Sequence, residues 1–349
     1  MSEATTNAVA APRASQRSGG AGRLPQVDEF SVVERTYSDD PDGMSVGIAN
    51  IEAVVPDIEA NKDKVLRAAQ VFRERGANVA VFPEFCLSGY FWDEPAACRR
   101  YMDAAVSERH RDWINQELRP ILGDELRVIV LNNLSQGADG LYRNRTFLVT
   151  VDDEEGYDFL APERSYDKIF LPGIERDFTS SGLDDRLVLD SRVGYGRFGF
   201  TTCYDYLFQE LLRSYTLKDG VDAIVQIASW RAVATRDYPR MNVRTDTYYG
   251  KLWDSVMSAS SATNQVWTIA CNAVGRHPVS GAAFWGGSGI WAPSGIPLIQ
   301  ASHIQEQLLL VHNLDISGSR QTELDDFDYA FDFRDVYNQI EGSKAQITA

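Results

Sequence analysis

The sequence predicts an α/β protein built as a layered sandwich of sheets and helices. Short apolar runs rich in β-branched residues recur along the chain, and helical segments lie between several of them. Other runs are joined by connections too short to hold a helix, such as residues 292–295 (APSG). Because intervening helices favour parallel strands and short turns favour antiparallel ones, we expect one α/β domain of mixed strand direction.

The first predicted elements are a strand, a helix and a second strand. Residues 44–52 (MSVGIANIE) and 77–84 (ANVAVFPE) are the apolar strands on either side of the helix. Gly76 is a suitable C-terminal cap for the helix. The helix itself, residues 57–76, is predicted because four apolar side chains recur on one of its faces: Ile58, Val65, Ala69 and Phe72.

The remaining strands follow at intervals along the chain. Each is a short run in which apolar residues, many of them β-branched or aromatic, dominate. They are residues 127–133, 145–151, 196–203, 222–229, 265–272, 287–293 and 307–316.

The two ends of the chain differ from this patterned region. Residues 1–40 lack hydrophobic periodicity, and much of this segment is rich in alanine, serine and glycine, as is typical of a disordered tail. No repeat or linker divides residues 41–318, which we expect to form a single domain. Residues 319–349 are acidic and aromatic. Their phenylalanines and tyrosines suggest that this extension docks on a second subunit.

Composition and charge disfavour several classes of partner. The net charge of −16 argues against nucleic acids and anionic membrane surfaces, because both attract clustered basic residues. No apolar run approaches the roughly 18 residues of a membrane-spanning helix. The N-terminus lacks the apolar core of a secretory signal. We therefore expect a cytoplasmic protein.

The four cysteines show the spacing of neither a disulfide framework nor a zinc site. Cys86, Cys98, Cys203 and Cys271 contain no CxxC pair, and no histidine lies at metal-ligand spacing from them. A cysteine in such a chain is most often a small buried apolar residue. Cys203 differs in position, because it ends a predicted strand where a segment that looks helical begins.

Three polar residues lie at the ends of short apolar segments or beside them. Taken singly, Glu84 would be a surface carboxylate, Lys168 a lysine that extends its ammonium group to solvent, and Cys203 a buried thiol. Together they fit nucleophilic catalysis. A thiol with an ordinary pKa of about 8.5 is mostly protonated at neutral pH and needs a base. A partly buried glutamate can accept that proton, and a lysine can stabilise an oxyanion.

The position of Cys203 adds to this chemistry. At a strand-to-helix turn, the thiol meets the N-terminus of the helix, whose N–H groups favour both a thiolate and a developing oxyanion. The backbone N–H of Tyr204 is then a natural oxyanion donor. We therefore predict that Cys203 is an activated nucleophile.

The segments around these three residues resemble the signature regions of the nitrilase superfamily of carbon–nitrogen hydrolases, in the order glutamate, lysine, cysteine. Further segments that resemble the family extend the likeness over about residues 45–315. The signature segments are residues 81–90 (VFPEFCLSGY), 165–182 (SYDKIFLPGIERDFTSSG) and 200–214 (FTTCYDYLFQELLRS); the others are residues 140–149, 220–230, 264–275 and 284–295.

The resemblance implies a four-layer αββα sandwich that often forms dimers or larger homo-oligomers. By position, it makes Glu84 the general base, Lys168 the group that stabilises the tetrahedral intermediate, and Cys203 the nucleophile that becomes acylated. Glu175 matches a second glutamate that orients the lysine or the substrate amine. The implied reaction releases ammonia or an amine, hydrolyses the thioester with water, and needs no metal or organic cofactor.

The residues after the nucleophile favour an amide over a nitrile as substrate. Residues 203–205 (CYD) resemble amidase-type branches, including those that act on ω-amides of small dicarboxylic acids. Such ω-amidase-like members usually carry an arginine where this chain has Leu207, and a proline or alanine where it has Gln209. The resemblance therefore does not establish recognition of a dicarboxylate monoamide. N-carbamoyl amines remain an alternative substrate class, followed by nitriles.

Aromatic residues near the expected site suggest an apolar or flat substrate, although any of them could belong to the core. We expect Tyr90, Trp92 and Trp230 to line the pocket, and Phe91 and Tyr204 lie in the same segments. Two hypotheses outside this hydrolysis are an inactive scaffold that binds through its C-terminal extension and a metal-dependent phosphoesterase. The complete set of glutamate, lysine and cysteine argues against the first, and the scarcity of histidine argues against the second.

Overall fold

The computed structural model confirms the mixed α/β prediction. No helix in the described residues is long and apolar enough to cross a membrane. The structure describes residues 30–90, 95–137, 139–151, 156–183, 186–191 and 194–337.

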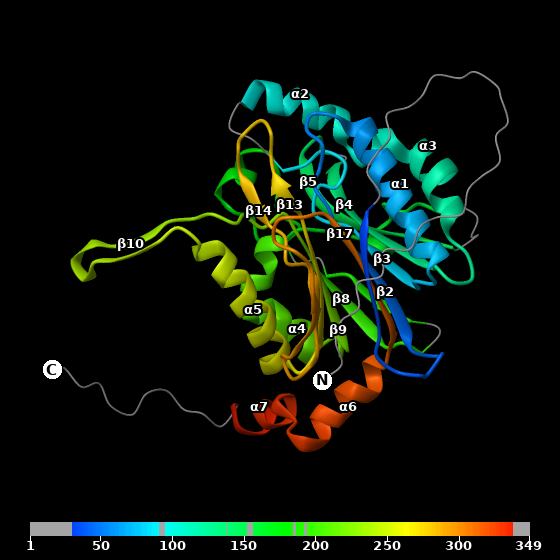
Figure 1. The fold of residues 1–349 in the computed structure, drawn as a ribbon, viewed down its shortest axis with the longest axis vertical. Coiled ribbons are helices and arrows are strands. Elements are labelled where there is room, and N and C mark those ends of the chain that lie inside the picture. The colour runs from blue at the N-terminus through cyan, green and yellow to red at the C-terminus, as the bar shows by residue number, and fades with distance from the viewer. Residues whose placement is uncertain are drawn as a thin grey trace.

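Two large twisted sheets form the centre of the molecule (Figure 1). The first has seven strands in the order β1 (Ser31–Thr36), β17 (Gln307–Leu314), β2 (Met44–Asn50), β3 (Val79–Val81), β4 (Val128–Gln136), β5 (Tyr142–Thr150) and β6 (Ser165–Asp167). The second has six strands in the order β16 (Pro297–Gln300), β15 (Gly289–Trp291), β12 (Trp267–Asn272), β9 (Ala223–Ala228), β8 (Arg197–Thr202) and β7 (Val188–Asp190).

Each large sheet has a parallel centre with antiparallel strands beside it. Strands β2, β3 and β4 run parallel, as do β8, β9 and β12. Strands β4 and β5, and likewise β12 and β15, pair antiparallel. Two small ribbons complete the strands: β10 (Arg236–Tyr238) with β11 (Val243–Thr245), which projects from the body in Figure 1, and β13 (Val274–Arg276) with β14 (Ala283–Trp285).

The apolar clusters show that the chain forms four layers, as the resemblance implies. One buried cluster joins the facing sides of the two sheets and includes Val46, Val130, Val225 and Ile269. Helices cover both outer faces, with α1, α2 and α3 on the first sheet and α4 and α5 on the second. The helices are α1 (Ile58–Glu74), α2 (Pro95–Ala105), α3 (Arg111–Trp113), α4 (Gln209–Leu217), α5 (Tyr248–Asn264), α6 (Ile316–Asp326) and α7 (Tyr329–Tyr337).

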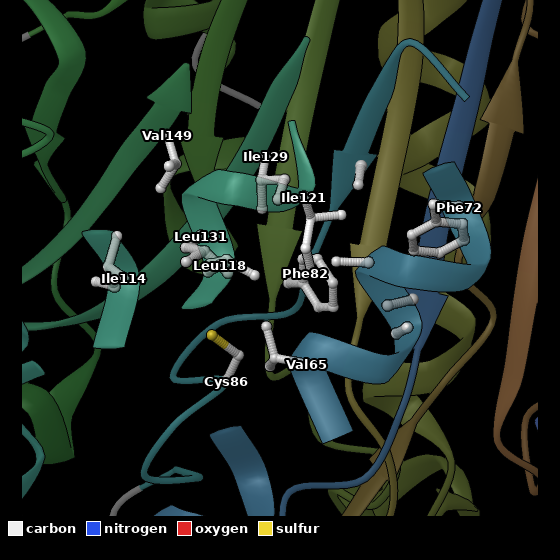
Figure 2. Close-up of a cluster of buried hydrophobic side chains, with 14 of the residues drawn as sticks. Val65, Phe72, Phe82, Cys86, Ile114, Leu118, Ile121, Ile129, Leu131 and Val149 are labelled. Atoms are coloured by element: carbon white, nitrogen blue, oxygen red, sulfur yellow. The ribbon is translucent and has the colours of Figure 1, made fainter. Parts of the chain in front are cut away.

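Helix α1 illustrates how sequence patterning fixes one of these layers. Asp57 caps its N-terminus by accepting a hydrogen bond from the N–H of Ala60, and Gly76 follows its end with a φ of 75°. Figure 2 shows Val65 and Phe72 of α1 in the buried cluster that covers the outer face of the seven-stranded sheet. Burial of such a side chain contributes about 1.5–3 kcal/mol, so this face anchors the layer.

The N-terminal boundary of the domain differs from the prediction. Residues 31–36 form β1, which pairs in parallel with β17, so the disordered tail predicted for residues 1–40 is wrong for this segment. A strand made from the far end of the chain supplies its hydrogen-bond partners, which local sequence patterning does not show. Residues 1–29 lie outside the described part.

The C-terminal extension folds back onto its own domain. Its predicted start at residue 319 falls inside α6, whose N-terminal cap is Asp315. The side chain of Gln265, at the end of α5, donates to the carbonyl of Phe327 and accepts from the N–H of Tyr329 at 2.9 Å. Arg320 pairs with Asp222 at 3.0 Å. Contact with a second subunit stays a prediction, and residues 338–349 lie outside the described part.

Candidate active site

The three predicted catalytic residues lie together where strands of the two sheets end. Glu84 follows β3 and Lys168 follows β6, both in the seven-stranded sheet, whereas Cys203 follows β8 in the six-stranded sheet. The Nζ atom of Lys168 lies 2.9 Å from Oε1 of Glu84, and the Cys203 thiol is close enough to Glu84 for a side-chain hydrogen bond. The packing of two sheets therefore joins residues separated by more than a hundred positions.

Lys168 lies between two buried carboxylates. Its Nζ atom is 2.6 Å from Oε1 of Glu175, in addition to its contact with Glu84, and all three side chains are buried. Burial disfavours the ammonium ion, but the carboxylates of Glu175 and Glu84 outweigh burial and raise the pKa of Lys168. Burial also raises the pKa of Glu175, against the opposing effect of Lys168. The lysine is therefore a fixed cation in this site.

Two residues that sequence reasoning did not assign to the site hold the Glu84 carboxylate. The Asn144 amide donates to Glu84 Oε1 at 2.8 Å and to Glu175 Oε2 at 3.1 Å. The backbone N–H of Ser229 donates to Glu84 Oε2 at 2.8 Å. With Lys168, these donors fix the carboxylate so that one face remains toward the thiol. The only signal for Asn144 was its place in the segment 140–149.

Cys203 occupies the strained turn that the sequence predicts, but the first helix is a short 3₁₀ turn, Cys203–Leu207, followed by α4. The φ of Cys203 is 50°, in the left-handed region that a side chain rarely adopts and that costs about 1–3 kcal/mol. The side chain of Gln226 donates to the Cys203 carbonyl at 2.9 Å. Burial raises the pKa of the Cys203 thiol, as does the Glu84 carboxylate, while Lys168 opposes them. The resting thiol is therefore protonated near neutral pH.

Asp205 braces this turn and was not assigned a role from the sequence. Its side chain and that of Thr202 cap one another across the turn. Its Oδ1 atom also accepts from the N–H of Phe170 at 2.7 Å, which ties the cysteine turn to the segment that carries Lys168. Burial raises the pKa of Asp205 to about 6, although Lys168 and its hydrogen bonds lower it. Asp205 therefore positions the nucleophile and the lysine together.

A pocket opens beside the thiol. Its volume is about 390 Å³, which suits a small-molecule ligand. Tyr90 and Trp230, both predicted here, lie in its wall, whereas Trp92 and its neighbour Phe91 fall outside the described residues. The wall also includes Tyr204 and Leu207. The Tyr90 hydroxyl donates to Glu175 Oε1 at 2.8 Å, so this aromatic ring joins the pocket to the buried charges.

The described residues contain no group of three or more histidine, cysteine or acidic side chains that could hold a metal ion. The charged site consists instead of two carboxylates, one ammonium group and one thiol. This set can transfer a proton from a thiol to a carboxylate and stabilise a negative oxygen, which are the requirements of nucleophilic acyl transfer.

Comparisons with known proteins agree with the fold and the site geometry. The chain is 25% identical over 294 residues to a nitrilase of Talaromyces marneffei, covering 78% of this chain and 86% of that protein. The amidase of Nesterenkonia sp. AN1, a nitrilase-superfamily structure, aligns with a TM-score of 0.63 at 22% identity, covering 86% of this chain and 97% of the amidase.

A larger enzyme contains the same fold. The glutamine-dependent NAD+ synthetase of Acinetobacter baumannii aligns with a TM-score of 0.60 at 18% identity, and the match covers 77% of this chain but only 45% of the synthetase. At this identity the likeness concerns the fold alone. The family model described as carbon–nitrogen hydrolase matches residues 45–323, and the chain therefore belongs to the carbon–nitrogen hydrolase family.

Proposed function

We propose that this enzyme hydrolyses the non-peptide carbon–nitrogen bond of a small amide through a thioester on Cys203. The observation that carries the proposal is the buried contact chain from the Cys203 thiol to Glu84 and from Glu84 to Lys168. A structural ion pair would have no need of a thiol at the mouth of a pocket. Cys203 remains 8% exposed and lines that pocket, whereas Lys168 is fully buried.

In the first half of the reaction, Glu84 acts as general base. Because the resting thiol is protonated, Glu84 takes its proton as the sulfur attacks the amide carbon, and a carbon–sulfur bond forms. The carbonyl oxygen becomes an oxyanion. The tetrahedral intermediate then collapses, the carbon–nitrogen bond breaks, and Glu84 returns the proton to the leaving nitrogen. Ammonia leaves from a primary amide and an acyl thioester remains on Cys203.

In the second half, water replaces the leaving group. Glu84 removes a proton from the water as its oxygen attacks the thioester carbon, and it returns that proton to the sulfur as the carbon–sulfur bond breaks. The products are a carboxylic acid and the free thiol. No oxidant, reductant or cofactor enters this balance.

The oxyanion requires donors that are in place before the reaction. Lys168 keeps its charge because both carboxylates raise its pKa, and Glu175 and Tyr90 restrict its position and that of the carboxylates. We assign the backbone N–H of Tyr204 as the second donor, since it lies in the first turn after the nucleophile. Glu175 therefore acts by positioning Lys168 rather than by transferring protons.

The choice of an amide is supported by the pocket and by one structural neighbour. The amidase of Nesterenkonia sp. AN1 has been solved with the acetamide moiety of fluoroacetamide added at its active-site cysteine. The residues at positions 203–205 of the present chain resemble those of amidase-type branches. N-carbamoyl amines and nitriles contain carbon centres that a thiol can also attack, so the test compares all three classes.

The test measures ammonia release by the wild type and by Cys203→Ala from a panel of small amides, N-carbamoyl compounds and nitriles. We expect release from amides that falls to background in the variant. Circular dichroism confirms that the variant is folded. Release that persists without the thiol would overturn the mechanism. A folded wild type that is inactive on every compound, together with a Cys203 thiol inert to alkylating reagents, would favour a catalytically inactive scaffold.

A further inference from the structure

Arg231 lines the pocket that contains Cys203 and has no acidic partner in the described part of the chain. A half-buried guanidinium group without a carboxylate is costly unless a ligand compensates it. We infer that Arg231 binds an anionic group, such as a carboxylate, at the end of the substrate remote from the scissile amide. This inference rests on the proposed amide hydrolysis and names the substrate class more narrowly.

The guanidinium group lies close to the catalytic charges but is separated from them by an aromatic ring. The Cζ atom of Arg231 is 5.9 Å from the centroid of the Tyr90 ring. The hydroxyl of the same ring donates to Glu175 at 2.8 Å, and Glu175 holds Lys168 at 2.6 Å. An anion on Arg231 is therefore about one aromatic ring away from the catalytic groups.

The backbone at Arg231 is fixed before any ligand binds. Arg231 forms a β-bridge with Phe284 of β14, and the next N–H, of Ala232, donates to Ala283 at 2.8 Å. Trp230 on the other side accepts a backbone hydrogen bond from Trp285 at 2.9 Å. Because these contacts hold the segment on a ribbon rather than on a free loop, the guanidinium needs little further ordering to bind a carboxylate.

The charges in the pocket give such a substrate one favoured direction. The carboxylates of Glu84 and Glu175 outnumber the ammonium of Lys168, so the catalytic end of the pocket repels an anion. Arg231 attracts it at the other end and can form a bidentate pair with a carboxylate. An amide with an anionic tail therefore binds with its amide toward Cys203.

The wall between these two ends is apolar. Ile174, Leu207 and Leu252 lie there, and none of them can bind a carboxylate. They suit an alkyl spacer. Leu207 occupies the position where a resembling branch carries arginine, so the cation in this pocket comes from Arg231 instead. The substrate class that these residues fit is a primary amide joined through a short alkyl chain to a carboxylate.

The first test measures binding without turnover. In the Cys203→Ala background, isothermal titration calorimetry compares glutaramate with 5-methylhexanamide, in which an isopropyl group replaces the carboxylate. We expect glutaramate to bind more tightly, and Arg231→Gln to weaken its binding by about 10–100-fold with little effect on 5-methylhexanamide. Arg240→Gln is the control, because it removes an exposed charge from the neighbouring ribbon. Equal effects of Arg231→Gln on both ligands, or no preference for glutaramate, would overturn the inference.

The second test uses the active enzyme and separates this inference from the proposed function. We expect Arg231→Gln to raise KM for succinamate and glutaramate with a smaller change in kcat, and Arg231→Lys to restore part of the loss. Hydrolysis of 5-methylhexanamide at least as efficient as that of glutaramate, and unchanged by Arg231→Gln, would contradict the inference while supporting amide hydrolysis. Failure to hydrolyse any amide would count against the proposed function, and the binding test would still decide the role of Arg231.

Discussion

Cys203 and Cys271 lie two strands apart in the same sheet, at nearly the same level. Thr202, just before Cys203, and Cys271 both align with Ile227 of the intervening strand β9. Burial raises the pKa of both thiols. Cys271 points into the apolar layer between the sheets, where its Sγ atom lies 3.2 Å from the carbonyl of Ala49. Cys203 has turned out of the strand, with a φ of 50°, into a pocket beside Glu84.

This difference shows that burial and cysteine chemistry alone do not make a nucleophile. A thiol inside a packed layer has no base and no access to a substrate. One residue beyond the end of a parallel strand, the left-handed turn brings Cys203 to a carboxylate and a cation that come from the other sheet. The chemistry of the site therefore depends on strand ends of two sheets meeting at one edge.

The largest expected effect contrasts the two cysteines directly. Cys203→Ala removes the only atom that forms the proposed thioester, so we expect kcat for amide hydrolysis to fall by at least about 10⁴-fold. Cys271→Ala leaves the reacting groups in place, and we expect its kcat to stay within about threefold of wild type. Ammonia release at saturating substrate measures both. Comparable losses in the two variants would remove the distinction between the two cysteines.

Lys168→Met tests the charges that set Cys203 apart from Cys271. The change leaves the buried carboxylates of Glu84 and Glu175 uncompensated, and we expect the free energy of unfolding to fall by about 3–5 kcal/mol. Urea denaturation measures it. The matched control is Lys251→Met, an exposed lysine of α5, for which the change should stay within about 0.5 kcal/mol.

A second substitution sharpens this result. Adding Glu175→Gln to Lys168→Met removes one of the two uncompensated charges, so the double variant should regain part of the lost stability. A double variant less stable than the Lys168→Met protein would show that the carboxylate is not the source of the cost.

The pH dependence of thiol alkylation reports the surroundings of Cys203. Burial and the Glu84 carboxylate raise the pKa of this thiol, so its thiolate, the reactive form, becomes populated only above the ordinary range of a free cysteine. We expect the rate of modification by iodoacetamide to keep rising with pH past that range. Glu84→Gln removes one of the two raising effects and should shift the profile to lower pH. Peptide mass spectrometry assigns the rate to Cys203, and an unshifted profile in this variant would contradict the predicted contact.

The smallest expected effect concerns the stability contribution of Cys271. Its thiol is fully buried between the sheets, and Cys271→Ala leaves a small void there, so we expect a loss of about 1–2 kcal/mol in the free energy of unfolding. Cys203→Ala should cost less, because that thiol borders a pocket. A larger loss for Cys203→Ala would mean that Cys203 has the greater role in packing.

The sequence predicts the elements that local patterning specifies. The apolar strand before Glu84, the amphipathic face of α1 and the strand-to-helix turn at Cys203 all follow from residue spacing, and the structure has them. Strand β1 could not be predicted, because its partner β17 lies at the opposite end of the chain. Local periodicity contains no information about such a pairing.

The supporting residues of the site could not be predicted for a related reason. Asn144 and Ser229 are ordinary polar residues at strand positions, and they reach Glu84 only because different strands bring them there. Asp205 looks like a helix-cap residue, yet its carboxylate also binds the segment after Lys168. Arg231 becomes informative only when its missing ion partner and the nearby pocket are seen together.

The most direct test of the central claim is to trap the acyl-enzyme and locate it. Wild-type protein is mixed with an amide that the ammonia assay shows to be a substrate, quenched in acid within the first turnover, and digested for mass spectrometry. The account predicts an added acyl group on the peptide that contains Cys203 and none on the peptide that contains Cys271. Turnover with no acyl group on Cys203, or acylation at another cysteine, would contradict it.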